Sequence, residues 1–177
     1  MNSSQQGSSL IMALLFIVAI GVLTMAALNT TTIQERIVGN SRDRNLAFQA
    51  AEAALRDAER DIDANVNVAT VFSSTCANGL CTYSTTGVPQ FATIDWTNAA
   101  VTRTYGAFTG ATALANVTQQ PRYIIEKLPP PPAVVGESVA LGIKPQANRS
   151  AYRITALGYG ARSETRVMLQ STYVRQQ

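Results

Sequence analysis

The stretch that decides the fold runs from Gln5 to Asn40 and reads QQGSSLIMALLFIVAIGVLTMAALNTTTIQERIVGN. From Leu10 to Leu28, the only residues that are not apolar are Gly21 and Thr24. As an α-helix this run would extend about 28 Å, which is close to the thickness of the hydrocarbon layer of a bilayer. Such a run could be a secretory signal, a simple membrane anchor, or the working part of the protein.

The length of the run and the sequence after it argue against a cleaved signal. A signal has an apolar core of about 7–15 residues, followed by a cleavage site of small residues. Here the helical pattern continues, and the first proline is Pro89. We therefore expect one helix from Ser8 to about Asp63, with an apolar first half and an amphipathic second half. The predicted core-facing positions, whose alanines would allow close packing, are Ile33, Ile37, Phe48, Ala51, Leu55, Ala58 and Ile62.

The composition gives no support for catalysis, a cofactor or a metal. The chain has no histidine, which removes the commonest general base and metal ligand. The one acidic cluster is Asp57, Asp61 and Asp63, which we interpret as a solvated helix end, since calcium needs six or more oxygen ligands. Residues 121–177 have eight basic and three acidic side chains, spread along strand-like segments. That distribution indicates a solvated sheet face or a partner-facing patch, not a nucleic-acid site.

The two cysteines, Cys76 and Cys81, enclose a turn centred on Asn78-Gly79. A zinc site would need two further ligands of a kind that the chain lacks. With an N-terminal membrane segment directing the domain out of the cytosol, we predict a disulfide between them. Because the loop that it closes is short, we expect it to hold that loop and contribute little to global stability.

The rest of the chain predicts a small α+β head. Residues 66–120 are poor in charge and indicate a variable loop region, with short strands or turns at 66–72, 92–96 and 101–105. In that region Trp96, Tyr105 and Phe108 either anchor the loop against the helix, which we favour, or form an exposed partner surface.

Residues 122–128 predict a strand that ends at the proline run 129–132, which we interpret as a stiff connector. Alternating segments at 151–159 and 165–174 predict a hairpin. Together the strands form a small antiparallel sheet packed over the exposed half of the helix.

The N-terminus resembles that of a type IV pilin. A short polar leader, Met1–Gly7, precedes a helix that is first apolar and then amphipathic. More specifically, TTIQERIVGN at 31–40 and LAFQAAEAALR at 46–56 resemble the PilX-type minor pilins, as do YRITALGYG at 152–160 and VMLQSTY at 167–173. The resemblance covers about 60 N-terminal and 25 C-terminal residues.

This resemblance implies a division of the chain and a set of partners. It implies a leader at 1–7, cut between Gly7 and Ser8, a transmembrane assembly segment at 8–28, and an amphipathic segment at 29–65. The loop region with the disulfide then spans 66–120 and the antiparallel sheet 121–177. Subunit packing would involve Leu10, Met12, Leu14, Ile17 and Gly21.

The implied partners are other minor pilins, the major pilin, the prepilin peptidase and the inner-membrane assembly platform. The protein would lie in the bacterial inner membrane with its head in the periplasm, and later in the pilus at the cell surface. Its function would be to help initiate type IV pilus assembly at or near the tip.

Three positions depart from the ordinary pilin pattern. The leader is uncharged, the first mature residue would be Ser8, and Met12 stands where ordinary pilins have a glutamate. A carboxylate in hydrocarbon costs at least ~2.5 kcal/mol unless it meets a positive partner. In the family that partner is thought to be the N-terminal amine of a neighbouring subunit. A subunit with Met12 offers the amine without the carboxylate, which suits a starter at the tip, although apolar packing alone would also account for it.

Other functions remain open at the level of sequence. A tip pseudopilin of a type II secretion system shares the architecture and includes a member without the glutamate, but that member is typically larger. A membrane-anchored adhesion or interaction protein is also compatible. A tethered enzyme would need a nucleophile with a base or converging carboxylates, and the sequence supports neither.

Overall fold

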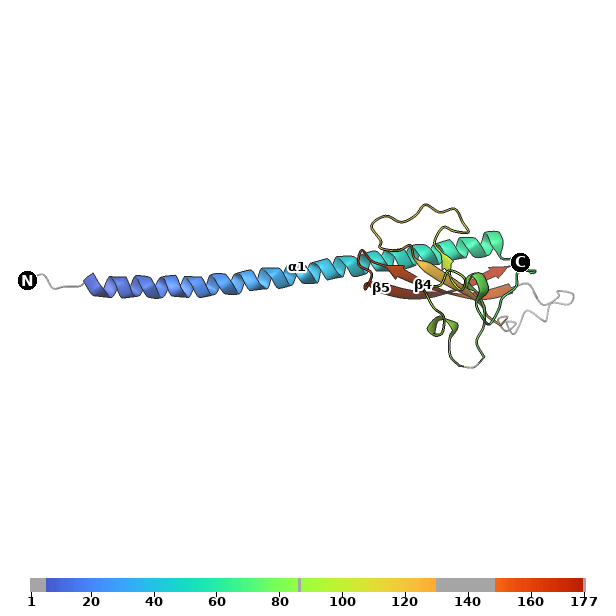
Figure 1. Ribbon diagram of the computed structural model, residues 1–177, viewed down its shortest axis with the longest axis horizontal. Coiled ribbons are helices and arrows are strands. Elements are labelled where there is room, and N and C mark those ends of the chain that lie inside the picture. Colours follow the sequence, from blue (N-terminus) through green and yellow to red (C-terminus); the bar gives the residue numbers. More distant parts are fainter. Residues whose placement is uncertain (1–5, 86, 130–148, 177) are drawn as a thin grey trace, which may run out of the picture. The chain divides into compact units, whose positions relative to one another are not determined.

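The computed structural model describes residues 6–85, 87–129 and 149–176. Its first element is one long helix, α1, Gln6–Asn65 (Figure 1). The chain divides into two compact units, residues 1–42 and 43–177, and we call the second the head. The predicted helix, with its apolar first half, is thus confirmed.

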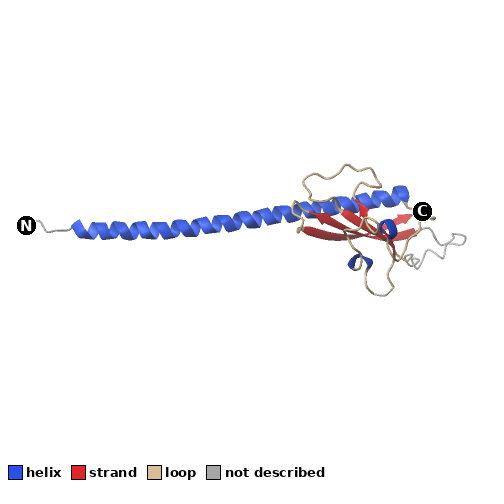
Figure 2. Ribbon diagram, viewed as in Figure 1, coloured by secondary structure: helices blue, strands red, loops and turns tan. Residues whose placement is uncertain are grey.

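The head combines the end of α1 with a sheet, as expected for an α+β fold (Figure 2). Its strands lie in the order β1-β3-β4-β5, and β2 also pairs with β3. After α1 the elements are η1 (Ala77–Gly79), β1 (Leu80–Thr82), η2 (Gln90–Ala92), β2 (Arg103–Thr104), β3 (Arg122–Lys127), β4 (Arg149–Tyr159) and β5 (Arg166–Gln176).

The sheet is mixed and not wholly antiparallel as predicted. The pair β1–β3 is parallel, with Leu80 opposite Ile125, whereas the other pairs are antiparallel. A parallel pair needs a long connection, and residues 83–121 supply one between these strands. Sequence patterning missed β1 because a strand of three residues is too short to show alternation.

The predicted hairpin is confirmed and slightly longer than expected. Strands β4 and β5 pair continuously from Tyr159 opposite Arg166 to Arg149 opposite Gln176. The predicted strand at 122–128 appears as β3. Of the three segments where we expect a short strand or turn, 101–105 contains the strand β2, and 66–72 and 92–96 contain turns. Of the predicted proline connector, residues 130–132 lie outside the described residues.

The face of α1 that meets the sheet is lined by alanines. Of the predicted core-facing positions, Ala51, Ala58 and Ile62 are buried, which confirms that part of the prediction. Phe48 is exposed at 43%, and Ile33 and Ile37, which precede the head, are exposed at 58% and 62%. A Cβ atom on Gly158 of β4 would overlap backbone atoms of Ala47 and Ala51, so the strand lies directly against the helix backbone. Large side chains cannot fit this contact around Gly158. The buried positions are Ala47, Ala50, Ala51, Ala54, Ala58 and Ile62.

Two apolar clusters stabilise the head, one on each face of the sheet. The first lies between α1 and the sheet and includes Ala58, Ile62, Tyr123 and Ile154, with Tyr105 packed against it. The second contains both cysteines and Ile124. It is covered by loop residues that include Phe91, Ile94, Trp96 and Val101.

The three aromatic residues of the loop therefore have different positions. Tyr105 packs on the cluster that contains helix residues, as expected. Trp96 packs on the opposite face of the sheet, where its Nε1 donates to the Phe91 carbonyl at 3.1 Å, so its predicted contact with the helix is wrong. Phe108 is partly exposed beneath the guanidinium of Arg103.

The C-terminal end of α1 is held by β5. The last turn of the helix contains no basic residue of its own. Instead Arg175 Nη1 donates to the carbonyls of Ile62 and Val66, at 2.5 and 2.6 Å. Nearby, the Tyr173 hydroxyl donates to the exposed Asp63. Helix-end carbonyls need such donors, and a cation there also complements the helix dipole.

Candidate functional site

The apolar segment, Ser8–Met25 of α1, is the described part of the chain that is long and apolar enough to cross a membrane. None of its side chains is buried by the chain itself. Within it, Thr24 Oγ1 donates to the Ile20 carbonyl at 2.8 Å. A surface of this kind needs lipid or other helices to cover it.

Four of the five predicted packing residues lie on one face of this segment. At about 100° per residue, Leu10, Leu14, Ile17 and Gly21 fall within a narrow stripe. Met12 points to roughly the opposite side, so it does not belong to the same contact surface. A Cβ added to Gly21 would have no atom within 4 Å, so another helix could approach the backbone closely at this position.

The predicted cleavage position lies at the start of α1. Residues 1–5 of the leader are outside the described residues, whereas Gln6 and Gly7 belong to the helix. Ser8 is exposed. Cleavage between Gly7 and Ser8 stays a prediction.

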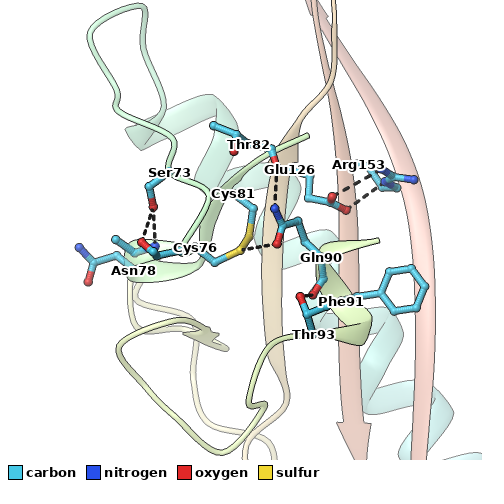
Figure 3. The surroundings of a disulfide bond; sticks show 12 residues. Ser73, Cys76, Asn78, Cys81, Thr82, Gln90, Phe91, Thr93, Glu126 and Arg153 are labelled. Carbon is cyan, nitrogen blue, oxygen red and sulfur yellow. Dashed lines mark hydrogen bonds and ion pairs between the residues drawn. A yellow bond between two sulfur atoms is a disulfide. The ribbon is translucent and has the colours of Figure 1, made fainter. Parts of the chain in front are cut away.

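In the head, Cys76 and Cys81 form the predicted disulfide, and both are fully buried (Figure 3). The turn between them is tightly bonded, because Ser73 accepts at its carbonyl from Thr82 N and at its hydroxyl from Ala77 N. Gln90 Nε2 donates to the Thr82 carbonyl at 3.3 Å. The other end of its amide, Oε1, lies 3.8 Å from Cys76 Sγ.

The disulfide turn is connected to the helix through Arg103. The Arg103 Nε donates to the Asn78 carbonyl in the turn at 2.8 Å, and its Nη1 forms an ion pair with Asp61 of α1. Asp61 is fully buried and also accepts from the Tyr123 hydroxyl at 3.0 Å. A Cβ on Gly79 would overlap Arg103, so the turn can approach only because a glycine stands there.

Asp57 makes a second connection between α1 and the loop region. Its carboxylate accepts from Gly106 N at 2.8 Å and from the Thr109 hydroxyl. Our interpretation of Asp57 and Asp61 as a solvated helix end is wrong, since both are buried, while Asp63 is exposed as expected. Burial, followed by the nearby charges of Asp61 and Asp57, raises the pKa of Tyr123 far above its usual range.

These connections include residues that the sequence reading did not single out. Arg103 is the only basic residue between 66 and 120, and Asp95 the only acid. An isolated arginine in a charge-poor segment, together with acids spaced by four on the helix, is a signal that could have suggested the ion pair. Tyr123 gave no such signal.

A buried acid also lies on the other face of the sheet. Glu126 is fully buried and pairs with Arg153, whose Nε is 3.0 Å from its carboxylate (Figure 3). Burial raises the pKa of Glu126 despite the lowering effect of Arg153. No group of three or more histidine, cysteine or acidic side chains in the described part of the chain could hold a metal ion.

Asp43 joins the hairpin turn to the first residues of the head. Its Oδ1 accepts from Ala161 N at 2.6 Å, and a Cβ on Gly160 would overlap the same carboxylate. The hydroxyl of Thr165, together with Ala161 N, Arg162 N and the Arg162 charge, holds the pKa of Asp43 below its usual value against the effect of burial. Asp57 and Asp61 thus bind the loop region to α1, and Asp43 binds the hairpin turn to it.

Two protein-family models match the chain. One, described as "PilX N-terminal", matches residues 6–56, and the other, described as "Type IV pilus assembly protein PilX C-term", matches residues 77–175. No curated protein and no solved structure shows a significant match.

Proposed function

The chain belongs to the PilX family of type IV pilus assembly proteins, and from this premise we propose that it is a minor pilin that starts pilus assembly at or near the tip. It acts with other minor pilins, onto which the major pilin is later added. The inner-membrane assembly platform and the prepilin peptidase are its further partners. The protein begins in the bacterial inner membrane with a periplasmic head and ends in the pilus.

The observation that carries the proposal is the fully uncovered apolar segment with Met12 in it. Leu10, Leu14 and Ile17 have exposed fractions of 60–70%, so no other part of the chain covers this surface. In the membrane lipid covers it, and in a fibre neighbouring helices cover it. Gly21 on the same stripe permits close helix contact.

Met12 determines where in the fibre the subunit belongs. After cleavage behind Gly7, the amine of Ser8 remains available to a carboxylate on the next subunit. Met12 has no carboxylate, so this subunit cannot be drawn to the N-terminal amine of a subunit that is already in the fibre. Recruitment can therefore proceed beneath this subunit but not above it, as a tip position requires. The family match also favours a pilus over a type II secretion system.

The first test is the intact mass of the protein extracted from membranes, with and without the prepilin peptidase. We expect peptidase-dependent loss of residues 1–7. Replacing Gly7 with leucine should block that loss and reduce piliation, whereas leucine at Ser4 in the same leader should not. Normal processing and normal pilus number in the Gly7→Leu variant would contradict the proposal.

The tip position is tested by Met12→Glu, with Met12→Leu as the control. Glutamate restores the carboxylate, so the variant should enter the shaft and change the number and composition of fibres. Leucine preserves an apolar side chain and should change neither. Fibres identical to the parent in both variants would remove the argument for a tip starter.

A further inference from the structure

The disulfide turn contains the chain's only asparagine followed by glycine, Asn78-Gly79. This pair is the sequence most prone to deamidation, because glycine has no side chain to hinder its nitrogen from reaching the asparagine amide. The nitrogen attacks the side-chain carbon Cγ, expels ammonia and closes a cyclic imide. Water then opens the imide to aspartate or isoaspartate. Asn78 is exposed, so exclusion of water does not prevent this reaction.

The fold requires both residues of this pair. Asn78 has φ 53° and ψ 32°, which lie in the left-handed region that asparagine adopts more readily than most residues with a side chain. Gly79 has φ 71°, and a Cβ added to it would lie 2.8 Å from Arg103 Cγ and 2.9 Å from Arg103 N. The close approach of Arg103 to the turn therefore imposes the labile pair.

The same backbone holds the reacting groups apart. At a ψ of 32° the Gly79 nitrogen lies on nearly the opposite side of the Cα–C bond of Asn78 from Cβ, whereas closing the imide requires both on the same side. The Gly79 N–H is also occupied, because it donates to the Cys76 carbonyl at 2.9 Å. Asn78 must therefore rotate about ψ, and Gly79 must lose this bond, before the nitrogen can attack.

The rotation of Asn78 is opposed by hydrogen bonds and by the disulfide. The Asn78 N–H donates to the Ala100 carbonyl at 2.7 Å, and its carbonyl accepts from Arg103 Nε at 2.8 Å. The Cys76–Cys81 bond closes the turn into a small ring (Figure 3). Hydrogen bonds of an exposed turn open in local fluctuations, whereas the covalent bond stays closed. The disulfide is therefore the constraint that still limits the reaction when the hydrogen bonds open.

We propose that Asn78 is a deamidation site that the Cys76–Cys81 disulfide keeps unreactive. The modification is independent of the proposed function, and the chain without its disulfide is the form that reacts. Isoaspartate, one of the two products, adds a methylene group to the main chain and converts the carbonyl that accepts from Arg103 into a carboxylate. The turn then loses its fit to Arg103, and with it the connection to Asp61 of α1.

The test follows the full chain in detergent at mildly alkaline pH and compares the parent with the double variant Cys76→Ser, Cys81→Ser. Trypsin releases residues 61–103 as one peptide, and fragment masses locate each amide converted to a carboxyl group. Asn98, which is exposed and followed by alanine, is the internal reference. Conversion at Asn78 should be roughly tenfold faster in the double variant, with Asn98 unchanged. Asn78→Gln should remove the signal.

Gly158→Ala distinguishes loss of the disulfide from general destabilisation of the head. This variant keeps the disulfide and disturbs the contact between β4 and α1. Its conversion rate at Asn78 should stay close to that of the parent. Fluorescence of Trp96, the single tryptophan, shows whether each variant is folded at the start. Equal rates in the parent and the double variant, or equal acceleration in Gly158→Ala and the double variant, would overturn the proposal.

Discussion

The two ends of α1 bury their surfaces in opposite ways. Most residues from 8 to 25 have large apolar side chains, and every residue in this range is exposed. Residues 43–65 have a stripe of alanines, and the sheet lies directly on it. Large apolar residues thus mark the part of α1 that the chain itself leaves uncovered, whereas small residues mark the part that the sheet covers. This difference predicts which substitutions alter folding and which alter assembly.

The largest effect should come from breaking the charge contact that holds the loop to the head part of α1. Arg103→Met leaves the fully buried Asp61 without its cation, which should cost about 3–5 kcal/mol of unfolding free energy. Arg56→Met is the control, because the exposed pair Arg56–Glu52 is worth roughly 0–1 kcal/mol. Urea unfolding followed by Trp96 fluorescence measures both, and equal losses would refute this role for Arg103.

The contrast between the two ends can be tested with one methyl group. Gly158→Ala should lose about 3 kcal/mol, because the new Cβ overlaps backbone atoms of α1 that cannot move aside. Gly21→Ala places the same group where no atom lies within 4 Å, so head stability should not change. The measurement is again urea unfolding. If Gly158→Ala is as stable as the parent, the close contact between β4 and α1 does not explain why the buried face of α1 consists of alanines.

The disulfide should have a smaller but measurable effect. Replacing Cys76 and Cys81 together with serine removes a constraint on a short loop, worth roughly 2 kcal/mol in the chain-entropy model. Because the Asn78 carbonyl of that turn also accepts a hydrogen bond from Arg103, part of the loss should disappear when Arg103→Met is present. A double-mutant cycle measures this coupling. Strict additivity would mean that the turn and the ion pair act separately.

The smallest effect is a dependence on pH at the start of the head. The pKa of Asp43 is lowered in the folded state, so its carboxylate stabilises the head above the usual aspartate range and this contribution is lost as pH falls. The stability difference between the parent and Asp43→Asn should therefore shrink from pH 6 to pH 3. Thermal midpoints across that range check it. A constant difference would show that the effect is not the charge.

The long helix, the hairpin and the disulfide could be predicted from the sequence because each has a local signal. The length of the apolar run predicted the segment from Leu10 to Leu28, and the alternation of apolar and polar residues predicted the hairpin of β4 and β5. The short spacing of Cys76 and Cys81 around a turn predicted the disulfide. Periodicity also gave the core-facing side of the second half of α1, but it favoured large residues such as Phe48. It cannot report how closely a partner approaches, and Gly158, which sets that distance, lies over 100 residues away.

Most polar contacts of the head could not be predicted from the sequence, for a related reason. The sequence does not distinguish a solvated aspartate from a buried one. Asp57 is buried because Gly106 and Thr109 fold back onto it and donate hydrogen bonds to its carboxylate. Likewise β1 becomes a strand only because β3 returns alongside it. Such features depend on contacts distant in sequence, which local patterns do not encode.

The cap that Arg175 places on α1 has a consequence for biosynthesis. The carbonyls that it binds belong to Ile62 in the last turn of α1 and to Val66 just after it, and Ile62 precedes Arg175 by 113 residues. At about 5–20 residues per second, the ribosome needs on the order of 10 s to make that interval. During this time α1 has left the ribosome without its cap and without the sheet over its alanines. The newly made protein therefore passes through a stage in which the alanine stripe of α1 is not yet covered by the sheet.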